Sequence, residues 1–233
     1  MKEFLLLLLA MLALQSAGCQ KRQAKSDTGI LAKQQQCEWF LAEVFDFGGG
    51  NRDLVLNPDG RAFKYAKAAK DAFYRKRAGE QSDRIFLSMI GGPKTAPRWL
   101  DLHPSSFRKQ FPSSEAFQSY LAANAKLIDA EANSYEGIAQ ALDYICRFGG
   151  GRKTATLIFS ESRNTASDKE QAHQRLVESL RAYMKRPGSQ CRFCWVAWEA
   201  IPELEKVFSE CGLTSRDIVP DAQHDPMFDD FEE

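Results

Sequence analysis

Hydrophobic positions along this chain follow two patterns that alternate. Short, nearly continuous apolar runs are typical of strands that are buried on both faces. Four such runs occupy residues 38–46, 84–91, 154–160 and 191–198. Between them, apolar residues recur every three to four positions, which is the spacing of one helix face. These segments predict helices at residues 60–77, 134–148, 168–186 and 201–211.

Three shorter segments complete the predicted set of elements. Residues 98–102 read as an edge strand with prolines at both limits, and residues 217–219 as a last short strand. Residues 114–124 read as a helix capped by Ser113 or Ser114. Strands that alternate with helices favour a parallel sheet covered on both faces. The expected fold class is therefore α/β: a doubly wound, mostly parallel six-stranded sheet in three layers, with one strand pair antiparallel.

Two charged residues fall at positions that the pattern predicts to be buried. Glu43 lies inside the first apolar run, and Lys70 shares the apolar helix face of Phe63, Ala66 and Phe73. A buried carboxylate without a partner is strongly unfavourable. We expect Glu43 to be structural and to be satisfied by a salt bridge or hydrogen bonds to a neighbouring strand. The alternative is that this strand lies at an edge of the sheet or starts later.

The N-terminus carries the pattern of an export signal. The apolar run at residues 4–14 is too short to span a bilayer and is placed like the core of a signal peptide. Ala17-Gly18-Cys19 resembles the end of a bacterial lipobox, in which Cys19 becomes the acylated N-terminus. The alternative is ordinary cleavage near Ala17, with Cys19 as a bystander. Gln20 resembles the residue that directs such proteins to an outer membrane.

These features divide the chain into four parts. They are a lipoprotein signal peptide at residues 1–18, a lipidated tether at 19–36, a folded domain at 37–220 and an acidic tail at 221–233. The predicted location is the bacterial cell envelope, with the lipid anchored in the outer membrane on its periplasmic side or at the surface. The tail could be a solvated end, or its Met227, Phe228 and Phe231 could form a short docking motif.

Charge content argues against nucleic-acid binding, and cysteine spacing argues against a disulfide or shared metal at one pair of cysteines. Lys and Arg together number 31, as do Asp and Glu, so no overall basic field indicates nucleic acid. Cys191 and Cys194 lie three apart in a predicted strand, so they point to opposite faces and cannot bond to each other or share a metal. The sequence leaves disulfide pairing open among Cys37, Cys146, Cys191, Cys194 and Cys211.

Candidate chemistry is concentrated where the first strand ends. That strand closes on Asp46, and three glycines, residues 48–50, follow almost at once. Open α/β sheets build their binding sites beyond the carboxyl ends of their strands. A strand that delivers one acid to a glycine-rich loop therefore predicts a site at this edge.

Three segments resemble the motifs of the von Willebrand factor A (VWA) family and occur in the family's order. They are Asp46-Phe-Gly48-Gly-Gly50, the segment from Glu136 to Leu142, and Glu161 just past the strand at 154–160. The resemblance covers nearly the whole domain and implies a VWA-like, Rossmann-like three-layer fold. It also implies a metal-ion-dependent adhesion site, in which a divalent cation binds a partner's carboxylate.

The candidate site departs from the family's ligand set. Gly48 and Gly50 replace two serine ligands, and Glu136 stands where the family has threonine. Three carboxylates, Asp46, Glu136 and Glu161, could still hold Mg²⁺ or Ca²⁺. The alternative is a degenerate site without metal, whose carboxylates accept backbone hydrogen bonds or face water. The loops of the proposed binding edge contain Gly48, Gly50, Asn51, Ser134 and Ser160.

The resulting functional hypothesis is a lipid-anchored module that binds another protein at the cell envelope and is not an enzyme. No Gly-x-Ser-x-Gly motif occurs, and the three histidines stand far apart in the sequence. One alternative is a metal-independent scaffold that acts through another surface, such as the acidic tail or residues 92–113. A second is an envelope hydrolase in which Asp46, Glu136 and Glu161 surround a metal-activated water.

Overall fold

The computed structural model describes residues 39–48, 51–57, 59–77, 83–91, 98–128 and 133–220. All of them belong to one compact unit, Glu38–Glu233. The predicted signal peptide, the tether and the acidic tail lie outside the described residues, as do Cys19, Cys37 and Gly50. Among the described helices, none has the length and apolar character needed to cross a membrane.

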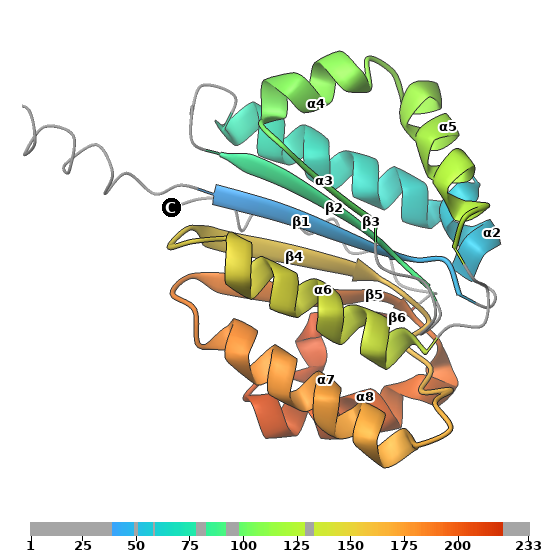
Figure 1. Cartoon of the computed structure of the whole chain (residues 1–233), viewed down its shortest axis with the longest axis vertical. Helices are drawn as coiled ribbons and strands as arrows, with labels where there is room; N and C mark the ends of the chain where they lie inside the picture. The colour runs from blue at the N-terminus through green and yellow to red at the C-terminus, as the bar shows by residue number, and fades with distance from the viewer. Residues whose placement is uncertain are drawn as a thin grey trace, which may run out of the picture. The chain divides into compact units, whose positions relative to one another are not determined.

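Six strands form one sheet in the order β3-β2-β1-β4-β5-β6 (Figure 1). Strand β1 lies at the centre and pairs in parallel with β2 and β4, while β3 pairs antiparallel with β2. Strands β5 and β6 extend the parallel part of the sheet. The fold class and the single antiparallel edge are as predicted. The strands are β1 Trp39–Asp46, β2 Arg84–Ile90, β3 Arg98–Leu102, β4 Lys153–Phe159, β5 Ser189–Val196 and β6 Ile218–Pro220.

Helices cover both faces of the sheet, which explains why the sequence of β1 is almost continuously apolar. Every residue of β1 is buried, with alternate side chains entering two separate cores. One core lies under α2, α3, α4 and α5, and the other under α6, α7 and α8. The helices are α2 Asn51–Leu56, α3 Arg61–Arg77, α4 Pro104–Gln110, α5 Ser114–Ala125, α6 Ser134–Phe148, α7 Lys169–Met184 and α8 Ile201–Cys211.

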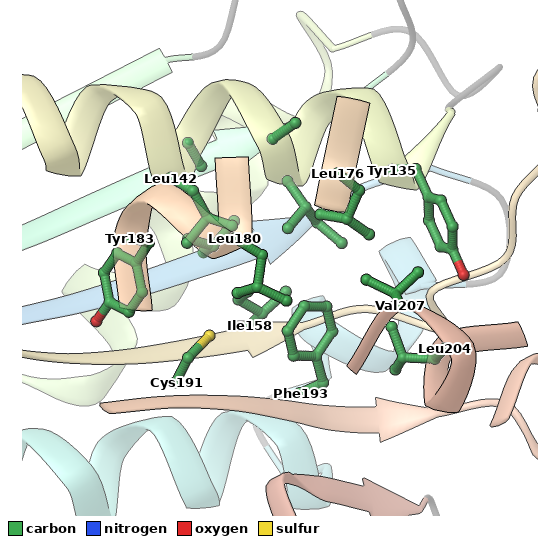
Figure 2. Close-up of a cluster of buried hydrophobic side chains, with 14 of the residues drawn as sticks. Tyr135, Leu142, Ile158, Leu176, Leu180, Tyr183, Cys191, Phe193, Leu204 and Val207 are labelled. Carbon is green, nitrogen blue, oxygen red and sulfur yellow. The ribbon is translucent and has the colours of Figure 1, made fainter. Parts of the chain in front are cut away.

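The second core contains the predicted apolar faces of the last three helices. Figure 2 shows Leu142, Leu176 and Leu204, from α6, α7 and α8, gathered over Phe193 of β5. Cys191 lies in this core and Cys194 in the other, so the two thiols face opposite sides of the sheet as predicted. The four cysteines of the described residues are all free thiols.

Two short helices were missed by the sequence prediction. Neither α2 nor α4 is among the predicted elements, because six or seven residues are too few to show a helical period. Helix α4 nevertheless carries local signals: Pro104 occupies its first turn, and the Nδ1 atom of His103 accepts a hydrogen bond from the Ser105 amide at 3.2 Å. Pro104 therefore marks the start of a helix as well as the end of a strand.

Gly149, the first residue after α6, does not form the left-handed cap that glycine often provides there. Gly149 follows α6 with right-handed angles (φ −66°, ψ −13°), and Gly150 takes the left-handed conformation (φ 60°). Room at Gly149 is needed for a different reason, because a Cβ there would lie 2.6 Å from the Nη2 atom of Arg186. That arginine donates to the carbonyls of Ile145 and Cys146, which satisfies the last turn of α6.

Glu43 is paired from a helix rather than from a neighbouring strand, through its Oε2 atom, while its buried Oε1 has no hydrogen-bond partner among the described residues. The Nζ atom of Lys70 lies 2.7 Å from Glu43 Oε2 and 3.0 Å from the carbonyl of Ala66. Burial raises the pKa of Glu43, and the charge of Lys70 opposes that shift. Burial in turn lowers the pKa of Lys70. The two anomalous positions of the sequence are therefore one buried ion pair.

Candidate functional site

The site lies beside the carboxyl end of β1, where the strand order reverses. Strand β2 lies on one side of β1 and β4 on the other. Segments that are distant in the sequence meet here: the loop after β1, the start of α6 and the loop after β4. Such switch points are where open α/β sheets place their ligand sites.

Asp46 is completely buried and accepts four hydrogen bonds from the protein. Its Oδ1 atom accepts from the Gly48 amide at 2.8 Å. Its Oδ2 atom accepts from Asn51 Nδ2 at 3.2 Å, Ser134 Oγ at 2.6 Å and Ser160 Oγ at 2.7 Å. A carboxylate offers about four lone-pair positions. Four donors of the described chain therefore hold the carboxylate of Asp46, three of them on Oδ2 and one on Oδ1.

A second layer of hydrogen bonds fixes the residues around Asp46. Asn51 Oδ1 accepts from the Glu161 amide at 2.8 Å, so one side chain connects the loops after β1 and β4. The hydroxyl of Ser160 accepts from the Ser162 amide at 2.8 Å. Ser162 takes a left-handed conformation with φ 56°, which is uncommon for a residue other than glycine. The loop after β4 is thus shaped to hold its polar groups inward.

The electrostatics of Asp46 reflect this enclosure. Burial raises the pKa of the Asp46 carboxyl, and the hydrogen bonds from Ser134, Ser160 and Gly48 oppose that shift. The nearby charge of Glu161 raises the pKa further. Hydrogen bonds that stabilise the ionised carboxylate thus act against desolvation and a like charge.

The three predicted carboxylates do not form a ligand set. Glu161 Oε2 lies 3.1 Å from Arg163 Nε, and Glu136 is half-buried in the first turn of α6. No group of three or more His, Cys, Asp or Glu side chains in the described part of the chain could hold a metal ion. In the structure, Asp46 faces inward to hydroxyl and amide donors, and Glu161 pairs with an arginine.

A divalent cation does not fit the chemistry of the donors that are present. Mg²⁺ and Ca²⁺ require about six or more oxygen ligands around one point. Gly48 presents an amide hydrogen to Asp46 instead of an oxygen, and both serine hydroxyls donate to the same carboxylate. Hydrogen bonds within the protein hold the acid and the two hydroxyls that a cation would otherwise recruit.

Sequence reasoning assigned the edge residues to the right place but to the wrong orientation. Asn51, Ser134 and Ser160 are predicted to lie in loops that face a partner. All three side chains are buried in the structure. The role of Asn51 as a connector was missed. Its position at the start of α2 would have been the signal, but α2 itself was not predicted.

The exposed part of this edge is formed by the loops after β4 and β5. Arg163 lies between two acids, with its Nε 3.1 Å from Glu161 Oε2 and its Nη2 3.7 Å from Glu199 Oε2. The Ala197 amide donates to the Glu161 carbonyl at 3.1 Å and joins the two loops. Trp198 is 58% exposed. We call Glu161, Arg163, Trp198 and Glu199 the rim.

Comparison with known proteins identifies the fold. No protein-family model matches the chain, and no curated protein matches it either. Among solved structures, the pilus adhesin SpaC from Lactobacillus rhamnosus GG matches 82% of this chain and 28% of its own length, with 8% identity and a TM-score of 0.51. The VWA domain of SpRpn10 matches 81% of this chain and 90% of its own length, with 16% identity and a TM-score of 0.44.

A von Willebrand factor type A protein from Catenulispora acidiphila also matches, over 82% of this chain and 39% of its own, with 13% identity and a TM-score of 0.43. The chain therefore shares an α/β fold with SpaC. At these identities the likeness extends to the fold alone.

Proposed function

We propose that this protein is a metal-independent protein-binding module of VWA type, held at the bacterial cell envelope by a lipid on Cys19. The observation that carries this proposal is the closed hydrogen-bond shell of Asp46. A metal-dependent adhesion site needs an acid that is open to a cation and, through it, to a partner. Here Asp46 accepts hydrogen bonds from its own chain, so a partner would be recognised by the exposed side chains of the same edge.

The rim supplies the side chains that such recognition needs. Tryptophan and arginine are enriched among the residues that carry most of the binding energy in protein interfaces. Trp198 is largely exposed and directly precedes Glu199, which lies 3.7 Å from Arg163. SpaC, which shares the fold, is a pilus adhesin, and adhesive binding of another protein is the activity we propose for this chain. We propose no catalytic role, because the hydrolase alternative requires an Asp46 that can reach substrate.

Photo-crosslinking at the rim tests the binding proposal. A photoreactive phenylalanine analogue at position 198 is expected to give a discrete adduct with one envelope protein in the native cells. The matched control is the same analogue at Phe148, an aromatic residue that is 48% exposed at the other end of α6, away from the Asp46 edge. Adducts of equal yield from both positions, or none from position 198, would contradict the proposal.

Divalent cations are expected to leave the melting temperature of the protein unchanged. A ligand at a hundred times its dissociation constant stabilises a folded protein by about 2.7 kcal/mol, which a melting curve detects easily. Millimolar Mg²⁺, Ca²⁺ or Mn²⁺ should therefore produce no shift relative to EDTA. A rise that EDTA reverses and that Asp46→Asn removes would restore the metal-dependent alternative.

The lipid anchor has its own test. Cys19→Ser is expected to abolish incorporation of labelled palmitate and to move the protein from the membrane fraction to the soluble fraction, because stable anchoring requires acyl chains. Cys37→Ser is the matched control and should stay in the membrane fraction. Membrane retention of the Cys19→Ser variant without label would disprove acylation at this residue.

A further inference from the structure

Charge is sorted along the strand axis of the sheet, although Lys and Arg balance Asp and Glu over the whole chain. Strand β1 runs from Trp39 at one edge of the sheet to Asp46 at the other. The segments around Asp46 and in the rim hold eight Asp and Glu against three Lys and Arg. They are residues 46–53, 133–137, 160–170 and 196–203. The edge at which β1 begins, which we call the basic edge, has the opposite charge.

The basic edge is formed by the ends of three helices and the starts of four parallel strands (Figure 1). Helices α3, α6 and α7 run back against the strands, so each ends at the edge where β2, β4 and β5 begin. The described residues of these ends and starts include ten Lys and Arg and one Asp. They are residues 74–77, 83–84, 145–153 and 181–190.

This excess of positive charge does not depend on which side chains are paired. Two of the basic residues form ion pairs with acids of other elements, Arg84 with Asp101 and Arg181 with Glu210. The adjoining segments 37–38 and 78–82 bring two more acids in the sequence, Glu38 and Glu80. With all of these acids counted, five positive charges remain in excess at the basic edge.

An exposed aromatic side chain lies within this positive surface. Phe148, the last residue of α6, is 48% exposed, and the three glycines that follow it carry no side chains that could cover it. Arg147 and Lys185, at the ends of α6 and α7, are exposed as well. Arg186 holds these two helix ends together, since it donates to two carbonyls in the last turn of α6. Cations at helix ends complement the helix dipole in any protein, but the exposed phenylalanine among them has no such structural role.

We propose that the basic edge binds the anionic headgroups of a membrane surface, with Phe148 in the headgroup region and the rim directed away from the membrane. Basic residues around an exposed aromatic ring are typical of protein surfaces that lie at the membrane interface. Anionic lipids attract such a surface within a Debye length, about 8 Å at physiological ionic strength.

The place where the chain enters the fold agrees with this orientation. The proposed lipid on Cys19 would join the domain at the basic edge, because β1 begins there with Trp39. Stable attachment to a membrane requires two signals, such as an acyl chain and a basic surface. The inference thus extends the proposed lipid anchor, and the first test is made without the lipid.

Vesicle binding of the exported chain without its lipid, residues 20–233, tests this proposal. This chain keeps the whole compact unit, Glu38–Glu233. It is expected to sediment with vesicles of phosphatidylcholine that contain about one third phosphatidylglycerol, and to stay in solution with phosphatidylcholine alone. Binding should fall steeply as NaCl rises from about 0.05 M to about 0.5 M, because salt screens exposed charges. Arg147→Glu with Lys185→Glu should weaken binding by at least about tenfold.

The matched control reverses two exposed lysines at the opposite edge. Lys126 follows α5, and Lys169 is the first residue of α7. Lys126→Glu with Lys169→Glu makes the same change in total charge and should bind like the wild type. Phe148→Ser should weaken binding while its salt dependence persists.

Orientation has its own readout in the lipidated protein on anionic vesicles. A photoreactive phenylalanine analogue at position 148 is expected to give lipid adducts, and the same analogue at position 198 is expected to give none. Lipid adducts differ in mass from protein adducts, so this measurement is separate from the search for a protein partner.

Five results would overturn the proposal. Failure of the wild type to sediment, or equal sedimentation with both kinds of vesicle, would remove recognition of anionic lipid. Equal losses in the two double variants would reduce the interaction to overall charge. Displacement by soluble glycerol phosphate at the same phosphate concentration would assign the surface to a free anion. Equal lipid adducts at both positions would remove the orientation. The sedimentation results involve neither the lipid on Cys19 nor a protein partner, so they leave the proposed function to its own tests.

Discussion

Asp46→Ala is expected to lower the free energy of unfolding by about 3–5 kcal/mol, although the side chain is small and reaches no ligand. The substitution removes the acceptor of Gly48, Asn51, Ser134 and Ser160 at once and leaves their donors buried. Each buried polar group without a partner costs about 1–3 kcal/mol, and relaxation of the loop keeps the total below the sum.

Urea denaturation at pH 7 measures this loss. Asp53→Ala is the control, because Asp53 is an exposed acid in the first turn of α2, seven residues after Asp46. Its removal should change stability by about 1 kcal/mol or less. Ser160→Ala is expected to fall between the two, since it removes one donor to Asp46 and the acceptor of the Ser162 amide. A loss below 1 kcal/mol for Asp46→Ala, within the range of the control, would mean that the shell is not structural.

Lys70→Met is expected to destabilise the protein by a similar amount, about 3–5 kcal/mol near neutral pH, because it leaves Glu43 buried without its counter-charge. The double replacement Glu43→Leu with Lys70→Met should be near neutral or more stable than the wild type, since apolar pairs often replace buried ion pairs well. Thermal or urea unfolding of the wild type, both single variants and the double variant gives the coupling energy directly.

The pH dependence of these variants has a definite sign. Burial already raises the pKa of Glu43 above 4.5, and the loss of Lys70 removes the charge that opposes that shift. A raised native pKa contributes stability below the unfolded pKa and loses it as the pH rises through the native value. The Lys70→Met variant should therefore regain stability on acidification toward pH 4.5 relative to the double variant, which lacks the carboxyl. Parallel pH profiles for the two variants would contradict this account of the ion pair.

The sequence predicted the scaffold well because burial leaves a simple signal. Strand β1 reads as a continuous apolar run since it lies at the centre of the sheet, and the faces of α3 and α6 show their helical period. The sequence also indicates that an ion pair is possible, because Glu43 in a buried strand and Lys70 on a buried helix face would each need a partner of opposite charge. Their pairing requires knowing that α3 packs over β1, which the spacing of residues does not give.

The candidate site was harder to predict, for a physical reason. The sequence placed Asp46, Ser134 and Ser160 at one edge, but it could not decide whether their oxygens face a ligand or each other. That choice depends on the backbone after β4, where Ser162 adopts a left-handed conformation, and on Asn51 in a helix too short to show a period. Loop conformation of this kind is set by tertiary contacts rather than by residue type.

The positions of the Asp46 partners in the sequence also determine when its hydrogen bonds can form during synthesis of the chain. Two of them, Ser134 and Ser160, lie 88 and 114 positions further along the sequence. During synthesis from the N-terminus, the acid is made long before either hydroxyl, and until then only water and its near neighbours Gly48 and Asn51 can donate to it. The centre of the sheet can therefore lock only after β4 has been translated and has docked on β1, and the later elements α7, β5, α8 and β6 are added after this edge has closed.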